Sequence, residues 1–74
     1  MPPARPLSYR EVVRKLRRAG FAEVSQKGSH VKFARATDAG VLSVIVPRHR
    51  EIAAGTLRSI TRQAGITLRE FDAL

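Results

Sequence analysis

Residues 31–46 read VKFARATDAGVLSVIV, and this stretch decides the fold. Two runs within it, 31–36 and 41–46, have the length of strands; the second is rich in β-branched residues, and the first contains Val31 and Phe33. Between them, residues 37–40 have the composition of a turn, because Asp favours the start of a turn and Gly accepts a positive φ. The stretch therefore predicts an antiparallel hairpin with a four-residue connection.

The expected pairing assigns the side chains of this hairpin to two faces. A four-residue connection pairs Ala36 with Val41, and directly opposed residues share a face. The face turned to the core then carries Val31, Phe33, Leu42, Val44 and Val46. The opposite face carries His30, Lys32, Ala34, Ser43 and Ile45. Because Ile45 and Val41 are apolar and turned to solvent, we expect them to form a docking surface for a protein.

An amphipathic helix is expected ahead of the hairpin, over residues 9–19. Ser8 and Glu11 have the spacing of a capping box, which begins a helix, and Gly20 is a natural helix end. Within this range, the apolar face consists of Tyr9, Val12, Val13, Leu16 and Ala19. The remaining surface carries a cluster of cations, namely Arg10, Arg14, Lys15, Arg17 and Arg18.

The other elements complete an α-β-β-β-α order. A short strand is expected over residues 21–26, and Pro47 ends the third strand. A second helix begins at residues 55–56 and ends at Gly65, and Thr67 starts a second capping box that begins a short last helix. We therefore expect an α+β domain, in which a three-stranded antiparallel sheet carries helices on one face.

Length and composition restrict the class of protein. A chain of 74 residues has room for a single domain, spanning residues 1–74, and we expect the Pro-rich residues 1–7 to form a flexible extension. The absence of Cys excludes disulfides, thiolate metal sites and Cys nucleophiles. The longest apolar run is far shorter than the ~20 residues of a membrane span, and the first residues lack the apolar core of a signal peptide. We expect a soluble cytoplasmic protein with no membrane partner.

The charge points to an anionic partner. Lys plus Arg number 14 against 6 Asp plus Glu, which gives a net charge of +8. A small domain with this charge attracts polyanions such as RNA, and a merely solvated surface is the alternative. The few aromatic residues argue against a platform for stacking several bases. Because so small a chain cannot enclose a large cofactor, we expect no small-molecule cofactor.

The segment KGSH at residues 27–30 is the first candidate for chemistry. Gly28 permits a tight turn, and Ser29 can bond a phosphate oxygen or cap the turn. His30 has the opposite parity to Val31 in the strand, so its ring points to solvent, where an imidazole can exchange a proton near neutral pH. The alternative is a plain hairpin turn followed by an incidental surface histidine.

A second imidazole, His49, lies near His30 in the expected register, because Pro47 faces His30 across the hairpin. Two imidazoles with several cations around one phosphate suit RNA cleavage by internal transfer. In that reaction a base takes the 2′-OH proton, cations stabilise the charge on phosphorus, and an acid protonates the leaving 5′ oxygen. A basic loop without chemistry is the alternative. With two His, no Cys and scattered acids, we expect no metal site.

Taken in order, these motifs resemble the HicA toxins, small mRNA interferases of bacterial toxin–antitoxin pairs. The matching segments are VVRKL (12–16), Gly20-Phe21, GSHVKF (28–33), VPRH (46–49), Glu51-Ile52, GTLRSI (55–60) and QAGI (63–66). The resemblance implies a fold similar to the double-stranded-RNA-binding domain. It also implies metal-independent RNA cleavage with His30 as the catalytic residue, and a HicB antitoxin that covers the active site.

The candidate site rests both on the chemistry of its residues and on the resemblance to the HicA toxins. We expect His30 to act as general acid or base, with Lys27, Lys32 and Arg48 holding phosphates. The expected RNA-binding set is completed by Gly28, Ser29, His49, Arg14 and Arg18. The alternative is a non-enzymatic RNA-binding module that uses the first helix and the basic loops. DNA binding is less favoured, because no helix-turn-helix spacing follows the first helix.

Overall fold

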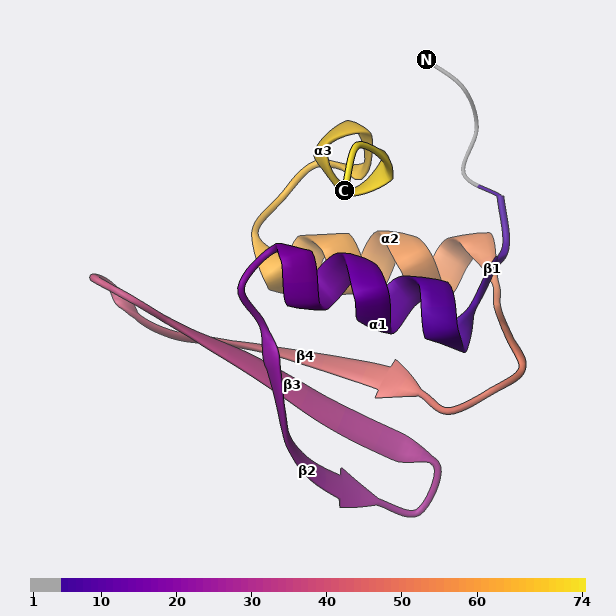
Figure 1. Ribbon diagram of the computed structural model, residues 1–74, viewed down its shortest axis with the longest axis horizontal. Helices are drawn as coiled ribbons and strands as arrows, with labels where there is room; N and C mark the ends of the chain where they lie inside the picture. Colours follow the sequence, from indigo (N-terminus) through magenta and orange to yellow (C-terminus); the bar gives the residue numbers. More distant parts are fainter. Residues whose placement is uncertain (1–4) are drawn as a thin grey trace.

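The computed structural model describes residues 5–74 and places the helices on one side of a β-sheet (Figure 1). In chain order, the elements are β1 (Leu7–Ser8), α1 (Tyr9–Arg18), β2 (Ala22–Lys27), β3 (His30–Thr37), β4 (Gly40–Pro47), β5 (Glu51–Ile52), α2 (Ala54–Ala64) and α3 (Leu68–Asp72). The expected α+β class and the three-stranded antiparallel sheet are confirmed, with strand order β2-β3-β4. Within residues 5–74, no helix is long and apolar enough to cross a membrane.

The β3–β4 hairpin has the expected register, in which Phe33 faces Val44. Its connection is tighter than expected, because the ladder continues to the pair formed by Thr37 and Gly40. The Thr37 hydroxyl donates to the carbonyl of Gly40 at 2.8 Å and ties the two strands together at the turn. The hairpin is therefore long, and its tip extends beyond the helices (Figure 1).

β2 pairs antiparallel with β3 and contains a β-bulge. The register shifts between Glu23 and Ser25, so β2 has one extra residue relative to β3. The strand expected over residues 21–26 is observed at Ala22–Lys27. Phe21, at the start of the expected range, is instead a core residue with 3% of its surface exposed.

The core lies between the sheet and the helices. The face of the β3–β4 hairpin that was expected to meet the helices does so, since Val31, Phe33, Val44 and Val46 are all buried, whereas Leu42 is only partly buried. The helices and β5 contribute Val12, Leu16, Ile52, Leu57, Ile60, Ala64 and Phe71. At the outer edge of β4, the Gln63 side-chain oxygen of α2 accepts the backbone N–H of Ile45 at 2.8 Å. This bond covers part of an otherwise open strand edge.

β1 and β5 form a small second sheet that the sequence patterns did not predict. Leu7 pairs with Ile52, and Ser8 pairs with Glu51. Strands of two residues are too short to show a hydrophobic periodicity. The flexible extension expected over residues 1–7 lies largely outside the described residues, but its last residue, Leu7, pairs in β1 and packs against the core.

Lys15 lies in the core, which corrects the expectation that it shares the exposed cationic face of α1. Only 6% of its surface is exposed. Its ammonium donates to three backbone carbonyls, those of Phe71, Asp72 and Leu74, at 3.3, 3.2 and 3.0 Å. These carbonyls lie at the C-terminal end of α3, where the helix dipole favours a cation. Lys15 therefore joins the first long helix to the end of the chain.

α3 begins with the expected capping box. The Thr67 hydroxyl accepts the N–H of Glu70, and a Glu70 carboxylate oxygen accepts the N–H of Thr67 at 2.8 Å. The hydrogen bond from the Thr67 backbone N–H above all, and then the Thr67 side chain, lower the pKa of the Glu70 carboxyl. The carboxylate therefore stabilises the fold at pH values above its usual pKa. This contribution is lost as the pH falls through the lowered value.

The buried ammonium of Lys15 provides a test of the fold. We expect Lys15→Met, which keeps the length of the side chain but removes its donors, to lower the free energy of unfolding by about 2 kcal/mol. The melting temperature should fall by about 10 °C in a domain of this size. Arg18→Met is the matched control, because it removes the same charge from an exposed position of α1. Equal melting temperatures for the two variants would contradict the structural role of Lys15.

Candidate active site

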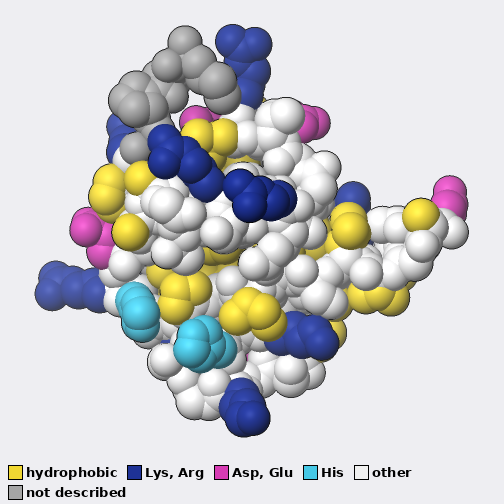
Figure 2. Space-filling view, turned by 180° about the vertical axis from the view of Figure 1, so that it is seen from behind, with side chains coloured by type: hydrophobic (Ala, Val, Ile, Leu, Met, Phe, Trp, Pro, Cys, Tyr) yellow, Lys and Arg dark blue, Asp and Glu magenta, His cyan; other side chains and the backbone are white. Residues whose placement is uncertain are grey.

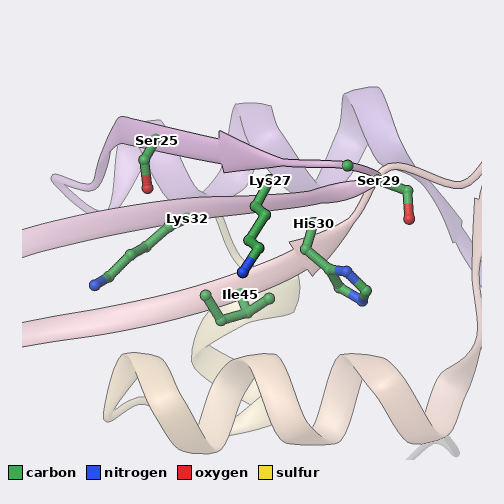
Figure 3. Close-up of a pocket in the computed structure, with 7 residues that line it drawn as sticks. Ser25, Lys27, Ser29, His30, Lys32 and Ile45 are labelled. Atoms are coloured by element: carbon green, nitrogen blue, oxygen red, sulfur yellow. The ribbon is translucent and has the colours of Figure 1, made fainter.

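A shallow hollow of about 700 Å³ lies on the face of the sheet that the helices leave uncovered. It is lined by Ser25, Lys27, Gly28, Ser29, His30, Lys32 and Ile45. Figure 3 shows Lys27, His30 and Lys32 extending from β2 and β3 toward the same side, with Ile45 of β4 between them. The structure therefore brings together five of the nine expected site residues in one place.

The β2–β3 turn positions the functional side chains of this hollow. Lys27 and His30 form the last pair of the β2–β3 ladder, with Gly28 and Ser29 between them. Gly28 has a φ of +59°, whereas the φ of Ser29 is not positive, which is the pattern of a type II′ turn. The Gln26 side-chain amide donates to the carbonyl of Gly28 at 3.0 Å. This turn fixes Lys27 and His30 on the same face of the sheet.

The hollow is cationic and its imidazole is free. None of the residues that line it is acidic, and Lys27 and Lys32 place two ammonium groups beside His30. Within residues 5–74, the His30 ring makes no hydrogen bond, so both ring nitrogens are available to a ligand. Such an arrangement can bind a phosphate and exchange a proton with a group held next to it.

Arg48 lies beside the turn but not in the hollow. Its backbone N–H donates to the carbonyl of Ser29, which extends the β3–β4 ladder by one step. Its guanidinium lies 5.9 Å from the centre of the Tyr9 ring and donates to the Gln26 side-chain oxygen at 3.3 Å. Burial raises the pKa of the Tyr9 hydroxyl, and the nearby positive charge of Arg48 opposes this effect. The side chain of Arg48 therefore lies toward α1, on the helix side of the sheet.

His49 lies on the same face of the molecule as His30. Figure 2 shows the two imidazoles as neighbours on one face, both open to solvent. The backbone N–H of His49 donates to the carbonyl of Pro47 at 2.8 Å, and Pro47 pairs with His30. The position expected from the register is thus supported, although His49 does not line the hollow itself.

Arg14 and Arg18 lie apart from the hollow, on exposed positions of α1. Arg14 forms an ion pair with Glu11 at 3.5 Å, and both line a second, smaller hollow of about 440 Å³ together with Ser8 and Arg10, whereas Arg18 lies outside it. Because α1 packs on the opposite side of the sheet from His30, these arginines form a second basic surface.

Ser25 is a lining residue that sequence reasoning missed. Without the bulge in β2, Ser25 would pair with Val31 and point toward the helices. The bulge shifts it opposite Lys32 and so onto the face of the hollow. No sequence signal marks the bulge, because Glu23, Val24 and Ser25 are ordinary strand residues.

The described part of the chain offers no ready-made metal centre. Among residues 5–74, no three His, Cys, Asp or Glu side chains gather in a group that could hold a metal ion. The chemistry that these residues can perform is proton transfer by His30 and electrostatic stabilisation of an anion by Lys27 and Lys32.

Comparison with known proteins assigns the chain to a protein family. No curated protein matches the chain. A family model described as the HicA toxin of bacterial toxin–antitoxin systems matches residues 9–66. This range runs from the first residue of α1 to two residues beyond α2, and it includes the β2–β3 turn and the whole hollow. The chain therefore belongs to the HicA family of bacterial toxins.

Proposed function

We propose that this toxin is an endoribonuclease that cleaves mRNA at the hollow around His30. The observation that carries the proposal is a solvent-exposed imidazole, free of protein partners within the described residues, beside two lysines in a site without acids. Membership of a toxin family supports it, because cleaving messengers is a direct way to stop growth.

The reaction is an internal transfer at phosphorus. His30, acting as a base, takes the proton of a ribose 2′-OH, and the 2′ oxygen forms a new bond to the adjacent phosphorus. The bond from phosphorus to the 5′ oxygen of the next nucleotide breaks, and that oxygen receives a proton from an acid. The products are a 2′,3′-cyclic phosphate and a 5′-hydroxyl end.

Lys27 and Lys32 hold the scissile phosphate and stabilise the negative charge that develops on it. Gly28 supports this role because its turn conformation brings Lys27 and His30 to one face of the sheet. Ser29, as a hydroxyl at the rim, can donate to a phosphate oxygen. Because the substrate supplies its own attacking oxygen, no metal-activated water is required for this step.

His49 is the candidate for the second proton-transfer group. The two imidazoles lie near each other on one face (Figure 2), as cleavage by a base and an acid on either side of one phosphate requires. Arg48 orders the segment between them, because its backbone extends the β3–β4 ladder and its side chain binds Gln26.

The family pairs each toxin with an antitoxin, and for this chain we propose a HicB-type antitoxin as the protein partner. A non-catalytic RNA-binding module is the second candidate function. The separate basic surface around Arg14 and Arg18 on α1 favours it, since that surface can hold RNA without cutting it.

The role of His30 is tested by His30→Ala, with Ser43→Ala as a control on the same face outside the hollow. We expect His30→Ala to lower the cleavage rate of a labelled messenger by at least ~10²-fold in EDTA, because general acid–base catalysis contributes about that much. Expression of the parent should arrest growth, and expression of His30→Ala should not. Equal cleavage by the parent and His30→Ala would show that His30 is not catalytic. RNA binding by the parent without cleavage products would favour the non-catalytic module.

The role of His49 is tested by the pH dependence of cleavage. With one base and one acid, the rate plotted against pH is bell-shaped. We expect His49→Ala to remove one limb of this profile while the melting temperature stays unchanged, because His49 is exposed. A uniform fall in rate at every pH would assign His49 to binding rather than to proton transfer.

The two basic surfaces are compared by removing equal charge from each. We expect Lys27→Ala/Lys32→Ala to lower both the RNA affinity and the cleavage rate at saturating RNA. The slope of log affinity against log salt should flatten by about 1.4, from ~0.7 per phosphate contact on a single strand. Arg14→Ala/Arg18→Ala should weaken binding but leave the saturated rate unchanged. The same saturated rate in both double variants would contradict a phosphate site in the hollow.

A further inference from the structure

The uncovered face of the β3–β4 hairpin has two chemically different halves. Near the β2–β3 turn it carries Lys27, His30 and Lys32. Toward the hairpin tip it carries only uncharged side chains, namely Ala34, Ala36, Val41 and Ser43. Three of the four are apolar, and we call the set the apolar strip. Val41 is its most prominent member, with 67% of its surface exposed.

We propose that the apolar strip is the docking surface for the antitoxin and is not used by RNA. The statement that RNA does not use the strip rests on the proposed RNA cleavage at His30. It divides the uncovered face into a cationic half that both ligands use and a distal half that only the protein partner uses.

The strip has neither of the groups that bind RNA strongly, cations and exposed aromatic rings. It carries no cation for a phosphate, and the aromatic rings of the described chain belong to the core or pack against it. Val41 is six residues from Pro47, the residue opposite His30, which places it roughly 20 Å along the strand from the reacting groups. The hairpin tip bears Asp38, whose negative charge repels a phosphate backbone.

The strip suits a protein partner because it continues the hollow. Ile45 lines the hollow, is 39% exposed and lies on the same face as Val41, so an apolar stripe leads from one half to the other. In Figure 2, hydrophobic side chains lie along the arm that extends to the hairpin tip. The bond between Thr37 and Gly40 restrains the tip, and restraint before binding lowers the entropy lost on docking.

Charge complementarity defines the chemistry of this partner. The ladder pairings place no acidic side chain on the uncovered face of β3 and β4, and the chain as a whole has a net charge of +8. A matching antitoxin surface carries carboxylates opposite Lys27 and Lys32, and an apolar patch opposite Ile45 and Val41. The carboxylates compete with phosphate, and the apolar patch supplies affinity that RNA cannot match.

The test measures antitoxin binding and RNA cleavage separately. The probe is the purified protein encoded by the gene adjacent to the toxin gene, and its Kd is measured by calorimetry. We expect Val41→Glu to weaken binding by about tenfold or more, since it removes an apolar contact and places a charge against the partner's apolar patch, where docking would strip it of water. Its rate of cleavage of a labelled messenger should stay within about twofold of the parent.

Two further variants test whether a loss of antitoxin binding comes from an altered strand or from the change in net charge alone. Val41→Thr keeps the β-branched shape of the strand and should weaken antitoxin binding by about fivefold, as expected for one methyl group. Ser59→Glu makes the same change in net charge on an exposed position of α2 and should leave the Kd unchanged. Melting temperatures show that each variant is folded.

The outcomes separate this inference from the proposed function. Equal Kd values for the parent and Val41→Glu would overturn the docking surface, as would failure of the parent to bind the probe. Equal losses of binding and cleavage in folded Val41→Glu would overturn the division of the face. If the parent binds the antitoxin but cuts no RNA, the proposed function fails, and the Kd of Val41→Glu still decides the docking surface.

Discussion

The pairing of β3 with β4 is the constraint on which the rest of this structure depends. Because side chains alternate strictly along a strand, one register decides the position of every residue of the hairpin. The same register that buries Phe33 against Val44 turns His30 and Lys32 to solvent. A slip by one residue would place a lysine in the core and a phenylalanine in water. The stability of the core therefore enforces the geometry of the site.

Much of this arrangement can be predicted from the residue pattern. The amphipathic period of residues 9–19, the runs of strand length and the capping residues Ser8 and Thr67 all indicate their elements correctly. At Ser8 the observed bond is an N-cap to the N–H of Glu11, whereas Thr67 and Glu70 form the full capping box. The exposure of His30 follows from its parity relative to Val31. These features are local, or depend on a single hairpin, so a pattern of a few residues contains the information.

The features that escaped prediction depend on contacts between distant segments. Lys15 is polar on a helical wheel, yet it is buried because the carbonyls of a helix more than fifty residues away surround its ammonium. Arg48 was grouped with His30 by its position in the chain, but Tyr9 and Gln26 hold its guanidinium on the other side of the sheet. The bulge of β2, which places Ser25 in the hollow, is not marked by any characteristic residue type in the sequence.

The bulge of β2 has a consequence for the behaviour of the protein in solution. β2 is an edge strand, and a regular edge strand invites edge-to-edge pairing with another molecule. An unpaired extra residue interrupts the regular spacing of N–H and C=O groups along that edge and increases the local twist. The local irregularity that shapes the hollow thereby also opposes self-association, so that resistance to aggregation and construction of the site depend on the same backbone defect.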